Sequence, residues 1–118
     1  MKSIFLKKQG ESPKNKVLDF LITHSDLDYS LKEISKYSGA GYSTVKLMMK
    51  DLLKNKWVAA TRKISKIKLY KLNTENIEVK KFIDFYWAVT ENEIGLEKKN
   101  NHISSSSAAG LAVSARNM

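Results

Sequence analysis

The residues best suited to chemistry lie in one lysine-rich stretch, residues 38–54. An apolar set recurs there at the spacing of one helix face: Val45, Met48, Met49, Leu52 and Leu53. The opposite face carries cations, hydroxyls and one aliphatic side chain: Tyr42, Ser43, Lys46, Leu47, Lys50 and Lys54. Such a helix buries its apolar face and leaves its lysines and hydroxyls free to bind an anion. The chemistry that this stretch offers is therefore recognition of an anion.

The net charge is concentrated around this stretch. Residues 1–40 carry seven lysines and five acidic residues, residues 41–72 carry nine basic residues and one acidic residue, and residues 73–118 carry five and six. Nearly all of the formal charge of +9 thus lies in residues 41–72. A surface that serves only solubility would spread its charge, so the clustering favours a polyanion as the partner. Lysine outnumbers arginine 19 to 2, which suits attraction to phosphates better than bidentate recognition of guanine.

Composition argues against several other classes of protein. The 118 residues are enough for one small domain. There is no cysteine, which excludes disulfides and thiolate metal sites. Glycine-rich phosphate loops and histidine–carboxylate motifs are missing; His24 is expected at a helix end, and His102 has no co-ligands. We therefore expect no enzyme, no cofactor, no metal site and no small-molecule ligand. No apolar stretch is long enough for a signal peptide or a membrane span, which predicts a cytoplasmic protein.

Two helices are predicted before the basic one. Ser12 and Pro13 begin the first, because serine caps free N–H groups and proline fits the first helical position, and its apolar pattern ends near residues 24–25. Residues 26–29 form a polar connection with room for a short strand. Ser30 and Glu33 have the spacing of a capping box, which begins the second helix. The inward face of this second helix is expected to be Leu31, Ile34 and Tyr37.

Glycines and an asparagine are expected to delimit the basic helix. Gly39 supplies a left-handed residue after the second helix, and Gly41 caps the third. Asn55 is expected to take the left-handed conformation that ends the third helix. Residues 57–72 then predict a β-hairpin, because two β-branched and aromatic runs flank a polar four-residue tip. The basic residues around that tip would project together: Arg62, Lys63, Lys66 and Lys68.

The order helix, helix, turn, helix, basic hairpin resembles the winged helix-turn-helix family of DNA-binding regulators. The resemblance covers residues 12–73 and rests on residues 38–45, 52–58 and 69–72. It departs from the family pattern at Gly41, which replaces the usual serine or threonine cap, and at the hairpin tip, which lacks the usual glycine. The resemblance implies a mainly α fold with a small β-hairpin, in which three helices plus a wing form a DNA-binding domain.

The resemblance also implies two sets of contacts with double-stranded DNA. The recognition helix, residues 42–54, would lie in the major groove, and the wing, residues 62–68, would lie on flanking phosphates or in the minor groove. The residues agree independently, since hydroxyls near a helix N-terminus suit a phosphate and Arg62 suits a narrow minor groove. The implied contacts are Tyr42, Ser43, Thr44, Lys46, Leu47, Lys50, Arg62, Lys63, Ser65, Lys66 and Lys68. Two alternatives stay open: Tyr42 as a lid over the turn, and Lys54 as a solvated helix end.

A second long helix is predicted after the hairpin, from Glu75 to about Glu93, with Thr74 as its cap. Its apolar residues cover about 200° of its circumference, whereas one core contact needs about 100°. We expect the surplus to meet a second copy in a homodimer, because apolar patches of this size usually mark interfaces. The predicted interface comprises Val79, Phe82, Ile83, Phe85, Tyr86, Trp87 and Val89. The alternative is that residues 1–11 fold back and cover this face within one chain.

The predicted organisation has four parts. Residues 1–11 form an N-terminal arm, with a short leading helix that packs on a partner as the alternative. Residues 12–73 form the DNA-binding domain, residues 74–95 the dimerisation helix, and residues 96–118 a flexible tail with little apolar bulk.

The leading interpretation is a homodimeric, sequence-specific transcriptional regulator. A plasmid or viral replication or partition factor is a second DNA-directed possibility, because such proteins reuse the same domain. A winged-helix protein-interaction module is a third, since fold alone does not determine function.

Overall fold

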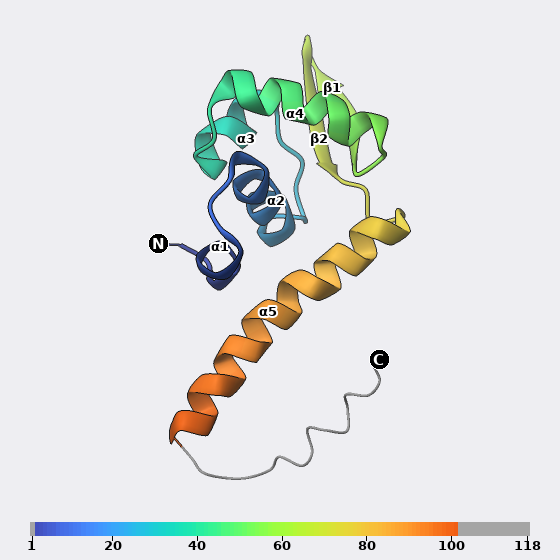
Figure 1. Cartoon of the computed structure of the whole chain (residues 1–118). Helices are drawn as coiled ribbons and strands as arrows, with labels where there is room; N and C mark the ends of the chain where they lie inside the picture. Colours follow the sequence, from blue (N-terminus) through green and yellow to red (C-terminus); the bar gives the residue numbers. More distant parts are fainter. Residues whose placement is uncertain (1, 102–118) are drawn as a thin grey trace.

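The computed structural model describes the backbone of residues 2–101 and the side chains of residues 2–95. Within these residues the chain forms five helices and one two-stranded antiparallel sheet (Figure 1). The elements follow in the order α1 (Ile4–Gln9), α2 (Pro13–Thr23), α3 (Leu31–Ser38), α4 (Tyr42–Lys54), β1 (Val58–Ile64), β2 (Ile67–Leu72) and α5 (Ile77–Asn101). The predicted mainly helical chain with one hairpin is confirmed. No helix in the described part of the chain is both long and apolar enough to cross a membrane.

Helices α2, α3 and α4 pack around one apolar core. The core residues that are least exposed come from all three helices: Val17, Leu21, Ile34, Val45 and Met49. Burial of a side chain of this size contributes about 1.5–3 kcal/mol relative to exposure, so these contacts hold the three helices together and turn the opposite face of α4 outward.

Tyr37 differs from its predicted position in the core. It is 55% exposed, because it lies at the end of α3, where its ring rests on the rim formed by Phe20 and Tyr29. The ring centroids are 5.9 Å and 6.4 Å from those two neighbours.

The predicted starts of α2 and α3 are confirmed. The Ser12 hydroxyl accepts a hydrogen bond from the Asn15 amide at 3.1 Å, and Pro13 occupies the first turn. Ser30 and Glu33 form a capping box: the Ser30 hydroxyl accepts from the Glu33 amide, and the Glu33 carboxylate accepts from the Ser30 amide. Each cap satisfies an N–H group that a helix leaves free at its first turn.

The left-handed residue after α3 is Gly39, with a φ of 84°, as predicted. After α4 the prediction of a left-handed Asn55 is wrong, because Asn55 has a φ of −87° and Lys56 has a φ of 63°. The amides of Lys56 and Trp57 donate to the carbonyls of Leu53 and Leu52, which places the left-handed residue one position later. The Lys56 carbonyl accepts further hydrogen bonds from the side chains of two asparagines that precede α5, Asn73 and Asn76.

Strands β1 and β2 form the predicted hairpin, but its tip is shorter than expected. Ile64 pairs with Ile67, so Ser65 and Lys66 alone make the turn. Ser65 takes a φ of 59°, the left-handed conformation that a glycine would adopt more readily. On the other edge of β2, Tyr29 makes an isolated antiparallel bridge with Tyr70. Residues 26–29 thus contain the short extended segment that their sequence allowed.

Helix α5 begins at Ile77, and the prediction of Thr74 as its cap is wrong. Asn76 caps it instead, since its side-chain oxygen accepts from the Glu78 amide at 2.8 Å. The helix continues to Asn101, so residues 96–101 are helical rather than part of a tail; Leu96, Glu97 and the lysines after them are strong helix formers. Residues 102–118, where the rest of the predicted tail and His102 lie, are outside the described residues.

The N-terminal segment is the main difference from the predicted organisation. It is not an arm: it forms α1, which packs against α5 (Figure 1). The Phe5 ring is buried and lies 4.8 Å from that of Tyr86 and 5.8 Å from that of Phe82. Asp19 on α2 joins the same contact, accepting hydrogen bonds from Ser3 and Tyr86. Burial, with the hydrogen bond to Asp19, raises the pKa of the Tyr86 phenol.

This packing corrects the predicted dimer interface. Val79, Tyr86 and Val89 are buried in the core of their own chain, so they are not available to a second copy. α1 covers this face, which is the alternative considered for residues 1–11. Of the other four predicted residues, Phe82 and Ile83 are half-buried, and Phe85 and Trp87 remain exposed.

Candidate nucleic-acid interface

All eleven side chains predicted to contact DNA are exposed, and they lie on α4 and the hairpin. On α4 the exposed face carries Lys46 and Lys50 one turn apart, with Leu47 beside them. Lys54 ends the same helix and is also exposed. Because Val45, Met49 and Leu52 are buried, the orientation of α4 predicted from its periodicity is confirmed.

The first turn of α4 lies beside this lysine face. Gly41 precedes the helix and offers no side-chain hydrogen bond to it, in contrast to the serines before α1, α2 and α3. The first amides of α4 therefore have no side-chain cap among the described residues. Ser43 and Thr44 are exposed on this turn and place hydroxyls beside those amides. This combination complements an anionic oxygen.

A hollow of about 330 Å³ joins α4 to the hairpin and to the start of α3. Its lining mixes cations, hydroxyls and apolar groups: Ser30, Leu31, Lys32, Tyr42, Lys66, Ile67, Lys68 and Tyr70. Three of these are lysines from two separate elements. Tyr42, the first residue of α4, is the residue through which this helix lines the hollow. The hollow thus offers one concave basic surface made by three elements.

Sequence reasoning missed Lys32 and Tyr70 as part of this surface. Lys32 lies inside the capping-box segment, and its sequence neighbours indicate only a solvated helix start. It faces the hollow because the hairpin folds over the start of α3, an arrangement that depends on the bridge between Tyr29 and Tyr70. No local pattern reports that long-range pairing.

The ladder of the hairpin places Lys63 directly opposite Lys68. Like charges in this position repel and destabilise a sheet unless an anion lies between them. Lys66 stands in the turn just beyond, and both strands are exposed here. The outer half of the hairpin is therefore a place where a phosphate group would relieve an unfavourable contact.

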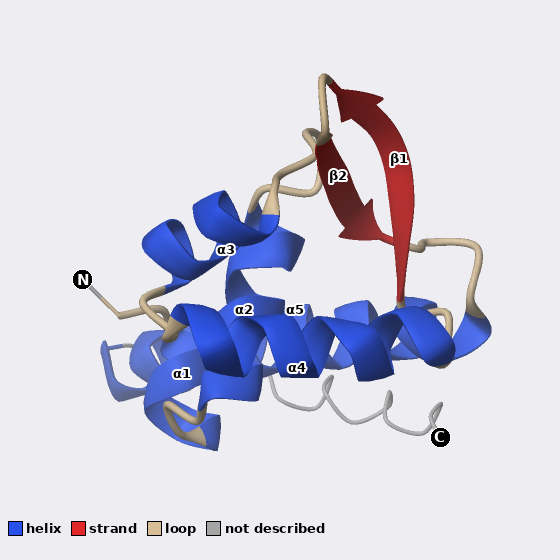
Figure 2. Ribbon diagram, turned by 90° about the horizontal axis from the view of Figure 1, so that it is seen from above, coloured by secondary structure: helices blue, strands red, loops and turns tan. Residues whose placement is uncertain are grey.

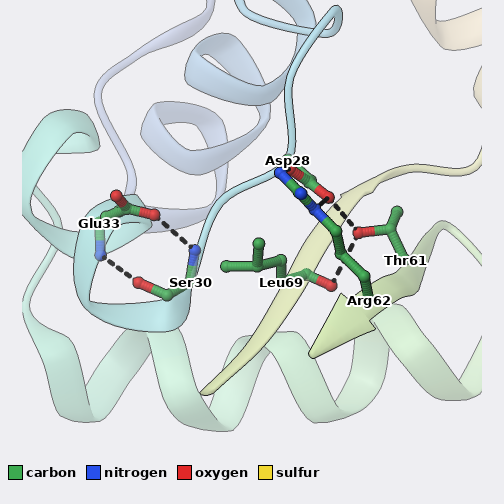
Figure 3. Close-up of polar contacts among 6 residues, drawn as sticks. All are labelled: Asp28, Ser30, Glu33, Thr61, Arg62 and Leu69. Carbon is green, nitrogen blue, oxygen red and sulfur yellow. Dashed lines mark hydrogen bonds and ion pairs between the residues drawn. The ribbon is translucent and has the colours of Figure 1, made fainter. Parts of the chain in front are cut away.

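Arg62, which the sequence suggested for a narrow minor groove, is exposed and is also paired with Asp28. Its Nε donates to Asp28 at 2.9 Å and a second guanidinium nitrogen donates to the other carboxylate oxygen at 3.1 Å (Figure 3). The Thr61 hydroxyl donates to the same carboxylate and lies 3.3 Å from the Leu69 carbonyl oxygen. The hydrogen bonds from Arg62 and then Thr61 lower the pKa of Asp28 to about 2.

A β-bulge makes this double contact possible. Ala60 pairs with Tyr70 and Arg62 pairs with Leu69, so Thr61 has no partner in the ladder. On a regular strand, adjacent side chains point to opposite faces, whereas a bulge lets two neighbours turn to one side. Thr61 and Arg62 can therefore both reach Asp28, which lies in the connection between α2 and α3. We call this contact, Asp28 with Thr61 and Arg62, the wing latch.

A second depression lies away from these cations, at the end of α2. Phe20, His24, Tyr29 and Tyr37 line it. His24 is exposed, as expected for a helix end, and its ring stacks on Phe20 at 4.7 Å. Within the described part of the chain, no group of three or more His, Asp or Glu side chains is placed to hold a metal ion.

Comparisons of the chain with known protein families, with curated proteins and with solved structures find no match. The geometry of the surface is therefore the basis for its interpretation.

Proposed function

We propose that the protein is a winged helix-turn-helix DNA-binding protein that binds double-stranded DNA with α4 in the major groove. In this interpretation the hairpin is the wing, and the bridge between Tyr29 and Tyr70 attaches it to the start of α3. The observation that carries the proposal is the basic concave surface shared by α4, the hairpin and the start of α3. Because three elements contribute to it, this surface could contact a phosphate backbone and the groove beside it. Its lysines would attract the phosphates without recognising particular bases.

Sequence selectivity would come from the shorter side chains between the lysines. Leu47 stands at the middle of the exposed face of α4 and suits a thymine methyl group, and Ser43 suits a base edge or a phosphate. The role that we propose is that of a transcriptional regulator acting on a palindromic site.

The first experiment is selection of bound duplexes from a random DNA pool, followed by an affinity measurement on the selected site. Lys46→Glu with Lys50→Glu should abolish binding, because two cations on the exposed face of α4 become anions. Lys80→Glu with Lys81→Glu changes the net charge equally on α5 and should retain most of the affinity. Equal losses in the two double variants, or no selected sequence, would reject the proposal.

We further propose that two copies associate through the flank of α5 that α1 leaves uncovered. Ile83, Trp87, Thr90 and Ile94 follow one another at intervals of four, three and four residues, which places them in one stripe. Trp87 is 44% exposed and Ile94 is 42% exposed. A pair of these stripes packed together would give a two-fold dimer, and its two α4 helices would fit half-sites about 34 Å apart.

Sedimentation of the purified chain tests this association. Trp87→Glu with Ile94→Glu should yield a monomer, since both changes bury charge in the contact. Ile77→Glu is the matched control, because Ile77 is an exposed apolar residue of α5 outside the stripe. A wild-type chain that sediments as a monomer when bound to its DNA site would contradict the proposed dimer.

A further inference from the structure

The tip of the hairpin exposes two isoleucines that the DNA contacts above do not use. Ile64 is 54% exposed and Ile67 is 55% exposed, and they are the last cross-strand pair before the turn. Mutual contact between such a pair supports the hairpin, but it leaves about half of each side chain in solvent. The tip of the hairpin projects beyond the helices in both views (Figure 1, Figure 2).

Cations surround this apolar tip. Lys63 and Lys68 form the adjacent cross-strand pair, and Lys66 lies within the turn itself. Their positive charge matches a polyanion and makes the tip unsuited to the apolar core of an uncharged protein partner. Proteins that bind the minor groove often combine cations with an exposed aliphatic side chain: the cations bind near the groove, and the aliphatic side chain enters the base stack.

The tip and the recognition helix share one hollow. Ile67 lines the same concave space as Tyr42, the first residue of α4, and Lys68 lies beside it. A duplex seated on α4 would therefore pass the hairpin tip at close range. The wing latch fixes the direction in which the hairpin projects, because Asp28 holds Thr61 and Arg62 at mid-strand.

We propose that Ile64 and Ile67 form an apolar wedge that enters the minor groove beside the α4 site and kinks the DNA. This inference rests on the proposed function and adds a deformation of the duplex to it. Wedges of this kind bend DNA by about 20–90°. Pyrimidine–purine steps such as TA unstack most readily, so the preferred sites carry such a step at the position of the wing. Sequence preference then extends to base pairs that no side chain reads by hydrogen bonding.

Bending of the selected duplex, labelled at both ends and followed by resonance energy transfer, tests the wedge. Wild-type protein should shorten the end-to-end distance. Ile64→Thr with Ile67→Thr should lose this shortening, while the slope of log affinity against log salt stays unchanged, because no cation is removed. Threonine keeps the β-branch that favours a strand, and circular dichroism confirms that the variant is folded.

The matched control is Ile77→Thr, an equally apolar residue that is 63% exposed at the start of α5. It should bend DNA like the wild type. Binding without any bend, or a bend that the threonine pair retains, would overturn the wedge and leave the proposed function standing. Absence of DNA binding would instead remove the proposed function. Binding of the wild type to vesicles of anionic lipid, lost in the threonine pair and without DNA bending, would assign the tip to a membrane surface and also overturn the wedge.

Discussion

At the scale of single residues, Asp28 is the most informative position, because it places a carboxylate against the basic hairpin, where it binds Arg62. A negative charge there would oppose the proposed DNA binding by Coulomb repulsion, whereas the wing latch would favour it by holding the hairpin against the start of α3. If this charge is removed, the loss of repulsion should raise the affinity for DNA, whereas the loss of the latch should lower it. Asp28 is only 12% exposed and binds Arg62 through both carboxylate oxygens, so we expect positioning to dominate.

Asp28→Asn should therefore weaken DNA binding by about 2- to 10-fold, although the variant is more basic than the wild type. The reason is that a freed hairpin must be ordered again on binding, which costs affinity. Fluorescence anisotropy with a labelled duplex provides the measurement. Asp26→Asn is the control, since it removes the same charge from an exposed position in the same connection and should bind as well as or better than the wild type. Tighter binding by Asp28→Asn would refute the latch.

The pKa of Asp28 predicts a limit on acid stability. Its folded value is lowered to about 2 from an ordinary value of 3.8, so the unfolded state takes up a proton first as the pH falls. The latch stabilises the fold fully above about pH 4 and loses this contribution as the pH drops from 3.8 towards 2. Urea unfolding at a series of pH values should show a shallower decline for Asp28→Asn over that interval. Parallel curves for the two proteins would contradict the assignment.

At the scale of elements, α1 has little stability of its own. Six residues are too few for an isolated helix in water, so α1 depends on its packing against α5. Phe5 provides that packing, with three aromatic rings of α5 within 6.4 Å of its own. Ser3 and Tyr86, which both donate to Asp19, tie α1 and α5 to α2.

Phe5→Ala should lower the free energy of unfolding by about 3–5 kcal/mol, the usual cost of emptying a buried aromatic site. The same change should detach α1 and expose the face of α5 that it covers. Thermal unfolding measures the first effect, and sedimentation at increasing concentration measures the second as self-association. Lys7→Ala, an exposed change in α1, should stay within about 0.5 kcal/mol of the wild type. Unchanged stability of Phe5→Ala would mean that α1 does not anchor α5.

These elements also show how far the sequence predicts the fold. The helices α2, α3 and α4 were predictable because serine caps mark the starts of the first two, a glycine turn precedes the third, and one period places Val17, Ile34 and Val45 inward. α1 could not be predicted in the same way, since its single apolar triplet, residues 4–6, is too short to show the periodicity that would distinguish a helix from an extended arm. The surplus apolar arc of α5 was recognised, but part of it packs on α1 and in the core of the same chain, because a monomer core can close over a helix from two sides.

The candidate site divides in the same way. The outward face of α4 follows from helical periodicity, so Lys46 and Lys50 were placed correctly on the surface. The wing latch depends on a bulge that shifts the register by one residue, and the partner of Arg62 is 34 positions earlier in the chain. Propensity and spacing contain no information on the bulge or on this long-range partner, and so the pairing of Arg62 with Asp28 was not predicted.

At the scale of the whole molecule, the proposed DNA surface and the proposed dimer contact lie on different elements. α5 leads from the base of the hairpin past α1 and away from α4 (Figure 1). Two copies joined along α5 would leave both basic surfaces open, so association and DNA binding do not compete. If a dimer binds with both surfaces, the cations of both copies should contribute to the dependence of affinity on salt.

For a dimer in which four or five lysines per copy displace counterions, log affinity should fall against log salt with a slope of about −7 to −9. Lys63→Ala with Lys68→Ala removes four of these cations from the dimer and should make the slope shallower by about 3 to 4 units.

Because Lys63 and Lys68 repel each other across the ladder in the free protein, the same variant should be at least as stable as the wild type in the absence of DNA. Lys7→Ala with Lys8→Ala, on α1 and outside the surface, should leave the slope unchanged. Lys63 and Lys68 are phosphate contacts only if both results hold together, since a fall in stability would attribute the weaker binding to a damaged hairpin instead.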